Sequence, residues 1–263
     1  MNNVYLEFLK ISFRKSFAYR ANSYLIMLGS IITLLIQVSL WSALLKNGSV
    51  NGVNLYDMTS YIIINTIVLS LTKTDIGNVL AEKVRDGSIA IDFIRPVKLK
   101  YFLFFDDMGQ SLFRTIFSVL PVCLVSILFL KFQAPGSLLD LALFIFSLLN
   151  GIMIIYQIHY FFGLLAFWLE STWYISWYLG ALLTLFGGTF VPLWFYPDFL
   201  YRLSKILPFR LVSFEPISIY LGKLSLEASI RVIASQIIWM ILFTLIEKLI
   251  WNRAQNKIFV QGG

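Results

Sequence analysis

One long stretch of this chain is almost free of charge. Between Leu141 and Pro197 the only charged side chain is that of Glu170. A soluble protein carries about one charged residue in four, so a soluble core does not explain the stretch. Over all 263 residues, 59% are hydrophobic and 13% charged, and the mean hydropathy is +0.79. The sequence therefore predicts an all-α, polytopic membrane protein.

Six apolar segments are predicted to be transmembrane helices. They are about Ser23–Leu45, Met58–Thr72, Tyr101–Leu130, Leu138–Leu169, Ser171–Leu193 and Ile230–Trp251. The second helix can run on past Lys73 and leave the membrane. The third is expected to kink near Pro121, and Glu170 is expected to mark a tight turn between the fourth and fifth. With no internal repeat, residues 1–263 are predicted to form a single domain.

Residues 1–22 are predicted to contain an amphipathic helix on the membrane surface. A polar stripe and an adjacent apolar stripe follow the helical period. The polar stripe is Asn3, Glu7, Lys10 and Arg14, and the apolar stripe is Leu6, Leu9, Phe13 and Phe17. Aromatic and basic side chains together suit the lipid headgroup region. The alternative is a short cytosolic helix packed on a partner.

Residues 192–225 combine prolines with apolar residues. Four of the seven prolines fall between positions 192 and 216. Apolar pieces broken by proline are too short to cross a bilayer, so we expect two short re-entrant helices on the external face. Trp194, Phe195 and Tyr196 are expected to sit at the outer interface as an aromatic belt.

Basic residues predict the orientation of the chain. With the N-terminus inside, 13 Lys and Arg residues fall in cytoplasmic segments and seven in external ones. The excess on one side favours cytoplasmic N- and C-termini, as in a multi-pass protein of the cell membrane. This asymmetry also accounts for the net charge of +7, so nucleic acid is not an expected partner.

A dense group of charges interrupts the apolar sequence after the second span. Residues 82–100, here called the charged segment, hold eight charged side chains in nineteen residues. A membrane protein places such a segment in water, where it can contact a soluble partner. Arg85, Asp86 and Gly87 offer charges and a flexible break. Arg95 and Pro96 are expected to stop any helix before the third span.

Polar residues inside predicted spans are candidate functional sites, because polar groups are costly at that depth. Asp106, Gln110 and Arg114 are spaced four residues apart, with Asp107 beside them. They suit either an inter-helix network near the interface, which we favour, or a path for protons or ions. The isolated polar residues Gln37, Asn65, Asn150 and Gln157 are expected to join helices rather than to contact a ligand.

A second candidate surface lies on the fifth predicted span. Gly180, Thr184 and Gly187 place small residues on one helical face, which suits either a dimer seam or the lining of a path.

Motifs for catalysis, nucleotides or metals are missing from the sequence. The chain has no phosphate-binding loop, one cysteine (Cys123) and one histidine (His159). We therefore expect no enzyme activity, no metal and no cofactor bound by this chain.

Five sequence motifs, taken in order, resemble those of ABC type-2 transporter permeases. They are Tyr19-Arg20-Ala21-Asn22 into Leu28-Gly29-Ser30, Asp86-Gly87-Ser88-Ile89-Ala90-Ile91-Asp92-Phe93-Ile94-Arg95-Pro96, Phe167-Trp168-Leu169-Glu170, Gly188-Thr189-Phe190-Val191-Pro192-Leu193-Trp194-Phe195, and Ile219-Tyr220-Leu221-Gly222-Lys223. They cover nearly the whole chain and look most like the membrane subunits of bacterial ABC exporters of the type V kind.

The resemblance implies a cytosolic coupling loop at residues 81–100 that docks into a separate ATPase. The residues implied in ATPase coupling are Glu82, Lys83, Arg85, Asp86, Gly87, Arg95 and Pro96. Ala90, Phe93 and Ile94 add an apolar edge. The implied partners are two cytosolic ATPase subunits, which would hold ATP and magnesium, a second permease that is identical or related, and membrane lipids.

Two other classes of function remain open on the sequence alone. A secondary carrier would need buried charges at the bilayer centre and an internal repeat, and neither is evident. A membrane-embedded enzyme or scaffold would need facing His or acidic residues. The exporter permease is the reading that we favour.

Overall fold

A computed structural model describes residues 2–46, 48–130, 133–169 and 173–261. These residues form an all-α fold. The α-helices are α1 (Asn2–Ser16), α2 (Arg20–Leu44), α3 (Leu55–Thr72), α4 (Ile76–Arg85), α5 (Ile89–Ile94), α6 (Leu99–Phe129), α7 (Leu138–Leu164), α8 (Trp173–Phe186), α9 (Asp198–Ile206), α10 (Phe214–Tyr220) and α11 (Leu226–Gln261). The predicted turn at Glu170 and the start of the fifth span at Ser171 lie outside the described residues.

Five helical segments in the described residues are long and apolar enough to cross a membrane. They are Tyr24–Leu44, Leu55–Arg85, Leu99–Phe129, Leu138–Phe167 and Leu226–Gln255. They correspond to five of the six predicted spans. The remaining one, α8, has 14 residues, about 21 Å of helix, against a hydrocarbon core of about 30 Å.

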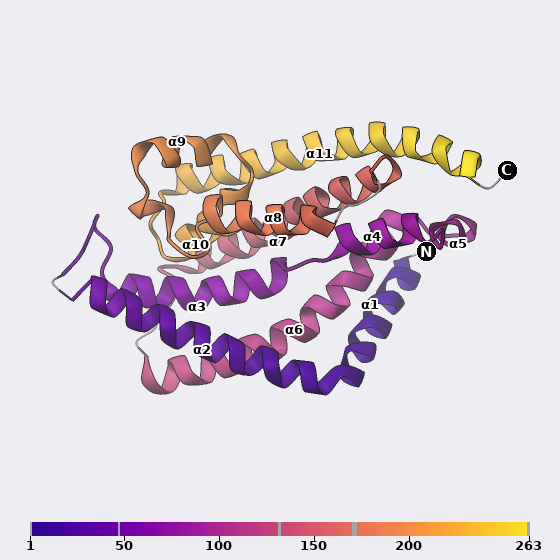
Figure 1. The fold of residues 1–263 in the computed structure, drawn as a ribbon. Coiled ribbons are helices and arrows are strands. Elements are labelled where there is room, and N and C mark those ends of the chain that lie inside the picture. The colour runs from indigo at the N-terminus through magenta and orange to yellow at the C-terminus, as the bar shows by residue number, and fades with distance from the viewer. Residues whose placement is uncertain (1, 47, 131–132, 170–172, 262–263) are drawn as a thin grey trace.

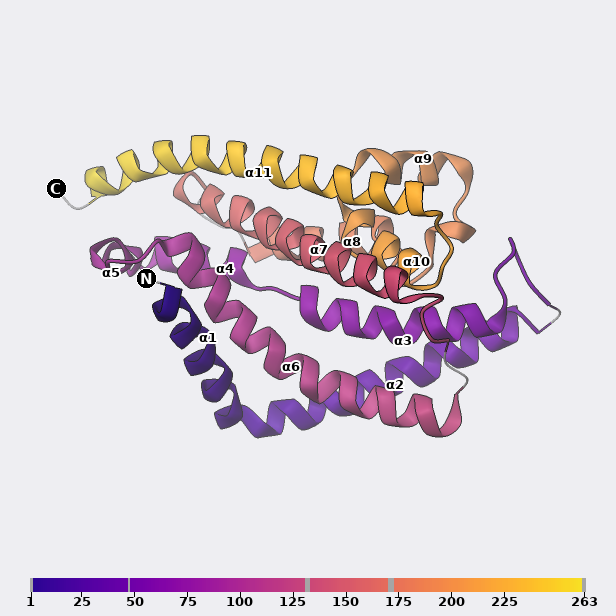
Figure 2. The same cartoon turned by 180° about the vertical axis from the view of Figure 1, so that it is seen from behind.

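The long helices run alongside one another, and the short helices gather at the two ends of the bundle (Figure 1). α9 and α10 lie at one end. α4, α5 and the described ends of the chain lie at the other, as the reverse view also shows (Figure 2). The main core is built from α3, α7, α8 and α10, around residues such as Tyr61, Ile154 and Ile217.

Helix α1 packs on α6 of its own chain. The two helices approach so closely at Gly109 that a Cβ atom there would lie 2.3 Å from the carbonyl oxygen of Leu9. Aromatic rings fill the rest of the contact, with Phe8 against Phe102 and Phe17 against Phe113. The partner of α1 is therefore α6, while Leu6, on the predicted apolar stripe, remains half exposed.

The second predicted helix does not continue past Lys73. α3 ends at Thr72, and Lys73 is in an extended conformation with ψ 116°. A new helix, α4, begins at Ile76 and crosses α7, where a Cβ on Gly163 would lie 3.0 Å from the Gly77 carbonyl oxygen. In α6, by contrast, the helix continues through Pro121.

The proline-rich region forms α9 and α10, joined by short 3-10 turns, and it is tied to α3. Tyr61 donates a hydrogen bond to the Gly188 carbonyl at 2.7 Å, and Asn65 donates one to the Thr189 carbonyl at 2.7 Å. Trp194 is half-buried, and its ring packs edge-on against Tyr61 and Phe214, because the turn after α8 folds back over α3. The aromatic belt of Trp194, Phe195 and Tyr196 at the outer interface stays a prediction.

Two of the four isolated polar residues, Asn150 and Gln157, join long helices, as the sequence predicts. Gln157 on α7 donates to the Thr244 hydroxyl on α11 at 2.7 Å. Asn150 contacts Gln236 at 3.3 Å, and Gln236 donates to the carbonyls of Ser147 and Leu211, both at 2.9 Å. Because hydrocarbon offers no competing water, these bonds fix the pairing of α7 with α11.

The close approach at Gly109 leads to a stability prediction. In Gly109→Ala the added methyl group collides with backbone of α1, which must shift outward. Overpacking of this kind costs about 1–3 kcal/mol. We expect a lower melting temperature of the detergent-solubilised protein and faster proteolysis within α1.

The matched control for this prediction is Gly29→Ala on α2, where nothing lies within 4 Å of the added atom. Replacing a helical glycine with alanine there should leave stability unchanged or raise it by up to about 1 kcal/mol. Equal effects of the two substitutions would contradict the close packing of α1 on α6.

Candidate functional site

The charged segment stands on a base of buried apolar residues. Ile76 and Leu80 on α4 and Ile89 on α5 pack with Tyr160 and Leu164 of α7. The start of α6 contributes Leu99 and Leu103 to the same cluster. The charged segment is therefore held against α7 by α4, α5 and the start of α6, and it is not a loose loop.

Gly87 makes the turn between α4 and α5. Its φ angle is +77°, in the left-handed region that glycine adopts without steric cost. The Asp86 carboxylate accepts a hydrogen bond from the Ser88 backbone N–H at 2.8 Å. The hydrogen bonds from Ser88, side chain and backbone, hold the pKa of Asp86 below its ordinary value. Asp86 is therefore a fixed negative charge at an exposed turn.

Asp92 forms ion pairs with two of the residues that are predicted to couple to an ATPase. Lys83 on α4 contacts its carboxylate at 2.6 Å, and Arg95, just after α5, contacts it at 3.0 Å. Asp92 is only 4% exposed, so the two cations compensate a charge that burial would otherwise make very costly. Both cations also lie over the ring of Phe102 on α6. This cluster fixes α5 relative to α4 and α6.

The outer edge of the charged segment is left uncovered. Ile94 is 84% exposed, and Ile91, Phe93 and Ala90 are also exposed. Beside them, Arg85 approaches only Glu82 on its own helix, at 4.0 Å, and both side chains are mostly exposed. The predicted apolar edge and its flanking charges thus share one accessible surface, here called the exposed edge.

The helix of α5 ends where the sequence predicts. Arg95, before Pro96, is extended with φ −70° and ψ 139°, because proline disfavours helical geometry in the residue before it. α6 then begins at Leu99. Phe93 stacks on Trp251 of α11, with 5.4 Å between the ring centroids and a 9° angle between planes.

The first turns of α6 are tied to two other helices. Lys100 forms an ion pair with the buried Glu247 of α11. The hydroxyl of Tyr156 on α7 donates a hydrogen bond to the Lys100 carbonyl. Any displacement of the charged segment therefore acts on α6, α7 and α11 together.

The predicted polar stripe on α6 divides into two groups. Gln110 donates to Asp106 at 3.1 Å on the exposed side. Arg114 instead crosses to the end of α3, donating to the Lys73 carbonyl at 2.6 Å and to the Ser111 hydroxyl at 2.7 Å. Asp107 lies within electrostatic reach of Arg114. These contacts fit the inter-helix network that the sequence favours, and a role in a transport path remains a prediction.

The small residues of α8 do not form one packed face within this chain. Gly180 has no neighbour within 4 Å of an added Cβ, and Thr184 is exposed, with its hydroxyl bonded to the Gly180 carbonyl. Gly187 is buried just past the helix end. Two of the three predicted residues are thus free for an intermolecular contact.

Asp92 and Glu247 are the residues that sequence reasoning did not select as site residues. The three-residue spacing of Asp92 and Arg95 could have suggested their pairing. No local pattern could reveal the pairs of Lys83 with Asp92 or of Lys100 with Glu247, because each joins separate helices. Among the described residues there is no group of three or more His, Cys, Asp or Glu side chains able to hold a metal ion.

Comparison with known families agrees with this architecture. A family model described as ABC-2 family transporter protein matches residues 26–262. A comparison with curated proteins gives no match. Because the family match spans all five long apolar helices and the charged segment, this multi-pass membrane protein belongs to the ABC-2 family of transporter membrane proteins.

Proposed function

We propose that the chain is the permease subunit of an ATP-binding cassette exporter and that its charged segment couples to a separate cytosolic ATPase. The observation that carries this proposal is the exposed edge, with Ile91, Ile94 and Arg85 accessible on a buried, ion-paired base. A loop that only contacts water does not need buried ion pairs and apolar contacts beneath it. An element that transmits force to the spans does need them, because it must not deform when it is pushed.

The contacts below the exposed edge support a route for that force. Asp92 joins α5 to Lys83 of α4 and to Arg95. Lys100 joins α6 to Glu247 on α11. ATP-driven closure of the ATPase subunits would push on α5, and these ion pairs would carry the displacement into the spans. The permease itself would supply the path and bind no nucleotide; ATP and magnesium would sit on the ATPase.

In this proposal α8 with its following turns completes a sixth span, and residues 192–225 form the external re-entrant region. Six spans place both termini in the cytoplasm, in line with the excess of basic residues at that end. The exposed Gly180 and Thr184 on α8 would face a second permease, identical or related, or the transport path. An aromatic-rich, weakly charged interior favours an amphipathic or lipid-like cargo.

The first prediction concerns partners. The chain alone should lack ATPase activity and should co-purify with a subunit that carries a phosphate-binding loop. Mass measurement after mild-detergent purification should give two ATPases and two permeases, because one subunit is small to enclose a path. Transport by the isolated chain in vesicles without ATPase would rule the proposal out.

A second prediction tests orientation. In a Cys123→Ala background, single cysteines at Ser49 and Ser137 should react with an impermeant thiol reagent added to intact cells. A cysteine at Ser88 should react only after permeabilisation. The opposite pattern would place the charged segment on the external side, out of reach of an ATPase.

A third prediction separates docking from simple solvation of the exposed edge. Arg85→Ala and Asp86→Ala should leave thermal stability within about 1 kcal/mol, because exposed charges contribute little. If these charges are desolvated against an ATPase, each substitution should weaken its binding by about 2–5 kcal/mol. Gly87→Pro should be more severe, since proline cannot adopt a φ of +77°.

The measurements for the third prediction are ATPase pull-down and transport per ATP hydrolysed. Arg202→Ala is the matched control, because Arg202 is an exposed arginine on α9 at the far end of the bundle. It should behave as the wild type. Wild-type binding and transport in all three variants of the charged segment would remove that segment from the mechanism.

A further inference from the structure

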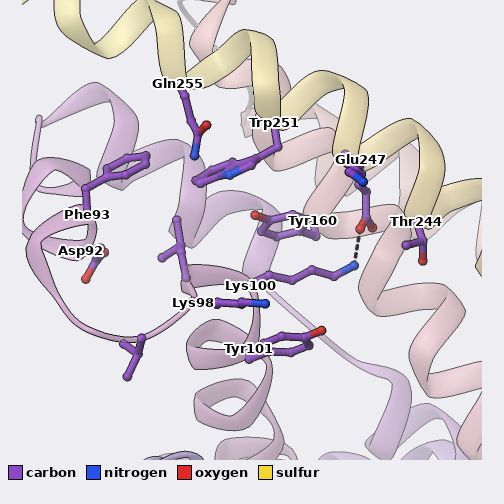
Figure 3. A pocket seen from close by; sticks show the side chains of 13 residues that line it. Asp92, Phe93, Lys98, Lys100, Tyr101, Tyr160, Thr244, Glu247, Trp251 and Gln255 are labelled. Atoms are coloured by element: carbon purple, nitrogen blue, oxygen red, sulfur yellow. Dashed lines mark hydrogen bonds and ion pairs between the residues drawn. The ribbon is translucent and has the colours of Figure 1, made fainter.

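A cavity of about 500 Å³ lies beside the base of the charged segment. It opens between α5, the start of α6, α7 and α11 (Figure 3). This volume is within the range of small-molecule sites in proteins. The cavity adjoins the exposed edge at Phe93, while Ile91 and Ile94 do not line it.

Three cations and two acids line the cavity. The cations are Lys98, Lys100 and Lys248. The two acids that line it are already paired, Glu247 with Lys100 and Asp92 with Lys83 and Arg95. Among the side chains that the structure describes, neither Lys98 nor Lys248 has an ion-pair partner. Two cations are therefore available to an anionic ligand.

Aromatic rings border these cations. Tyr101, Tyr160 and Trp251 line the cavity, and the amine of Lys98 lies 5.9 Å from the centre of the Tyr101 ring. Figure 3 shows Lys100 extending from the start of α6 to Glu247 of α11, with Lys98 beside Tyr101. Tyrosine and tryptophan side chains with lysines are typical of the level at which lipid headgroups meet hydrocarbon.

Exposed aliphatic side chains lie on α11 next to the cavity. Ile241 and Ile237 lie three and seven residues before the lining residue Thr244, on the same face of the helix, and both are exposed. A ligand held by the lysines would thus have apolar surface beside it. This combination fits a molecule with an anionic head and hydrocarbon chains better than it fits a small soluble anion.

We propose that this cavity binds the headgroup of an anionic phospholipid, with the phosphate between Lys98 and Lys248 and the acyl chains along α11. Basic pockets between membrane helices on the cytoplasmic side can hold such headgroups. A bound lipid would bridge the charged segment to the last span, beside the stacked rings of Phe93 and Trp251. The proposal goes beyond ATPase coupling and holds whatever the transporter carries.

The experiment compares lipid binding by the full-length protein in native mass spectrometry. Phosphatidylglycerol and phosphatidylcholine with identical chains serve as probes. The wild type should bind phosphatidylglycerol more tightly than phosphatidylcholine. Lys98→Gln and Lys248→Gln should each lower that preference about fivefold, the equivalent of about 1 kcal/mol per lysine, and Lys248→Arg should retain it.

Arg253→Gln is the matched control, because Arg253 is an exposed cation on α11 that does not line the cavity. It should keep the wild-type preference. An equal loss in Arg253→Gln, or no preference in the wild type, would overturn the proposal. Glycerol phosphate, which has no chains, should not displace the lipid; displacement at comparable concentration would make this a site for soluble anions and would overturn the lipid assignment.

Discussion

The hydrogen bond from Arg114 to the Lys73 carbonyl, at 2.6 Å, stabilises the break on which the placement of the charged segment depends. A helix that stops inside a membrane protein leaves carbonyl groups without partners, and each would cost several kcal/mol in hydrocarbon. The guanidinium and the nearby Ser111 hydroxyl, which donates to the same carbonyl at 3.2 Å, give the Lys73 carbonyl two donors. A cation at a helix C-terminus also interacts favourably with the helix dipole.

Because α3 can end there, α4 is free to take a different direction and to pack on α7. The crossing needs glycine on both sides, at Gly77 and Gly163, since a side chain on either would meet backbone of the other helix. The crossing in turn fixes where α4 ends and where the turn at Gly87 lies. Asp92 then completes the arrangement. Removing either cation would leave a buried carboxylate only partly compensated, a loss that costs about 3–5 kcal/mol for a fully buried pair.

Features that depend on local sequence could be predicted. Long apolar segments, the stop at Pro96 and the turn at Gly87 follow from hydropathy and backbone chemistry over a few residues. The break at Lys73 could not be predicted, because the group that stabilises it, Arg114, is 41 residues away. The four-residue spacing groups Arg114 with Gln110 on one face of α6 and gives no sign that Arg114 contacts the end of α3.

Contacts between helices that are far apart in the chain could not be predicted from the sequence either. The amphipathic pattern of residues 1–22 suits a lipid surface and a protein surface equally well, and it is the contacts at Gly109 and Phe102 that show α1 packing on α6. In the same way, the aromatic residues around Trp194 suggest an interfacial belt, and the sequence does not reveal that the Trp194 ring packs on Tyr61 and Phe214. Hydropathy measures preference for an apolar environment and does not distinguish lipid from protein.

The bundle is tied together unevenly, and this bears on how a displacement could pass through it. Gln157 and Gln236 bind α7 to α11 through hydrogen bonds that no water competes for. Exposed apolar side chains, which lipid or another subunit must cover, occur on α2 and α8, as with Leu25 and Trp177, and also on α11, as with Leu249. Ion pairs at the base of the charged segment join it to the tightly bonded helices. In the proposed coupling, a push on that segment would act first on α6, α7 and α11, the helices that these ion pairs and hydrogen bonds join.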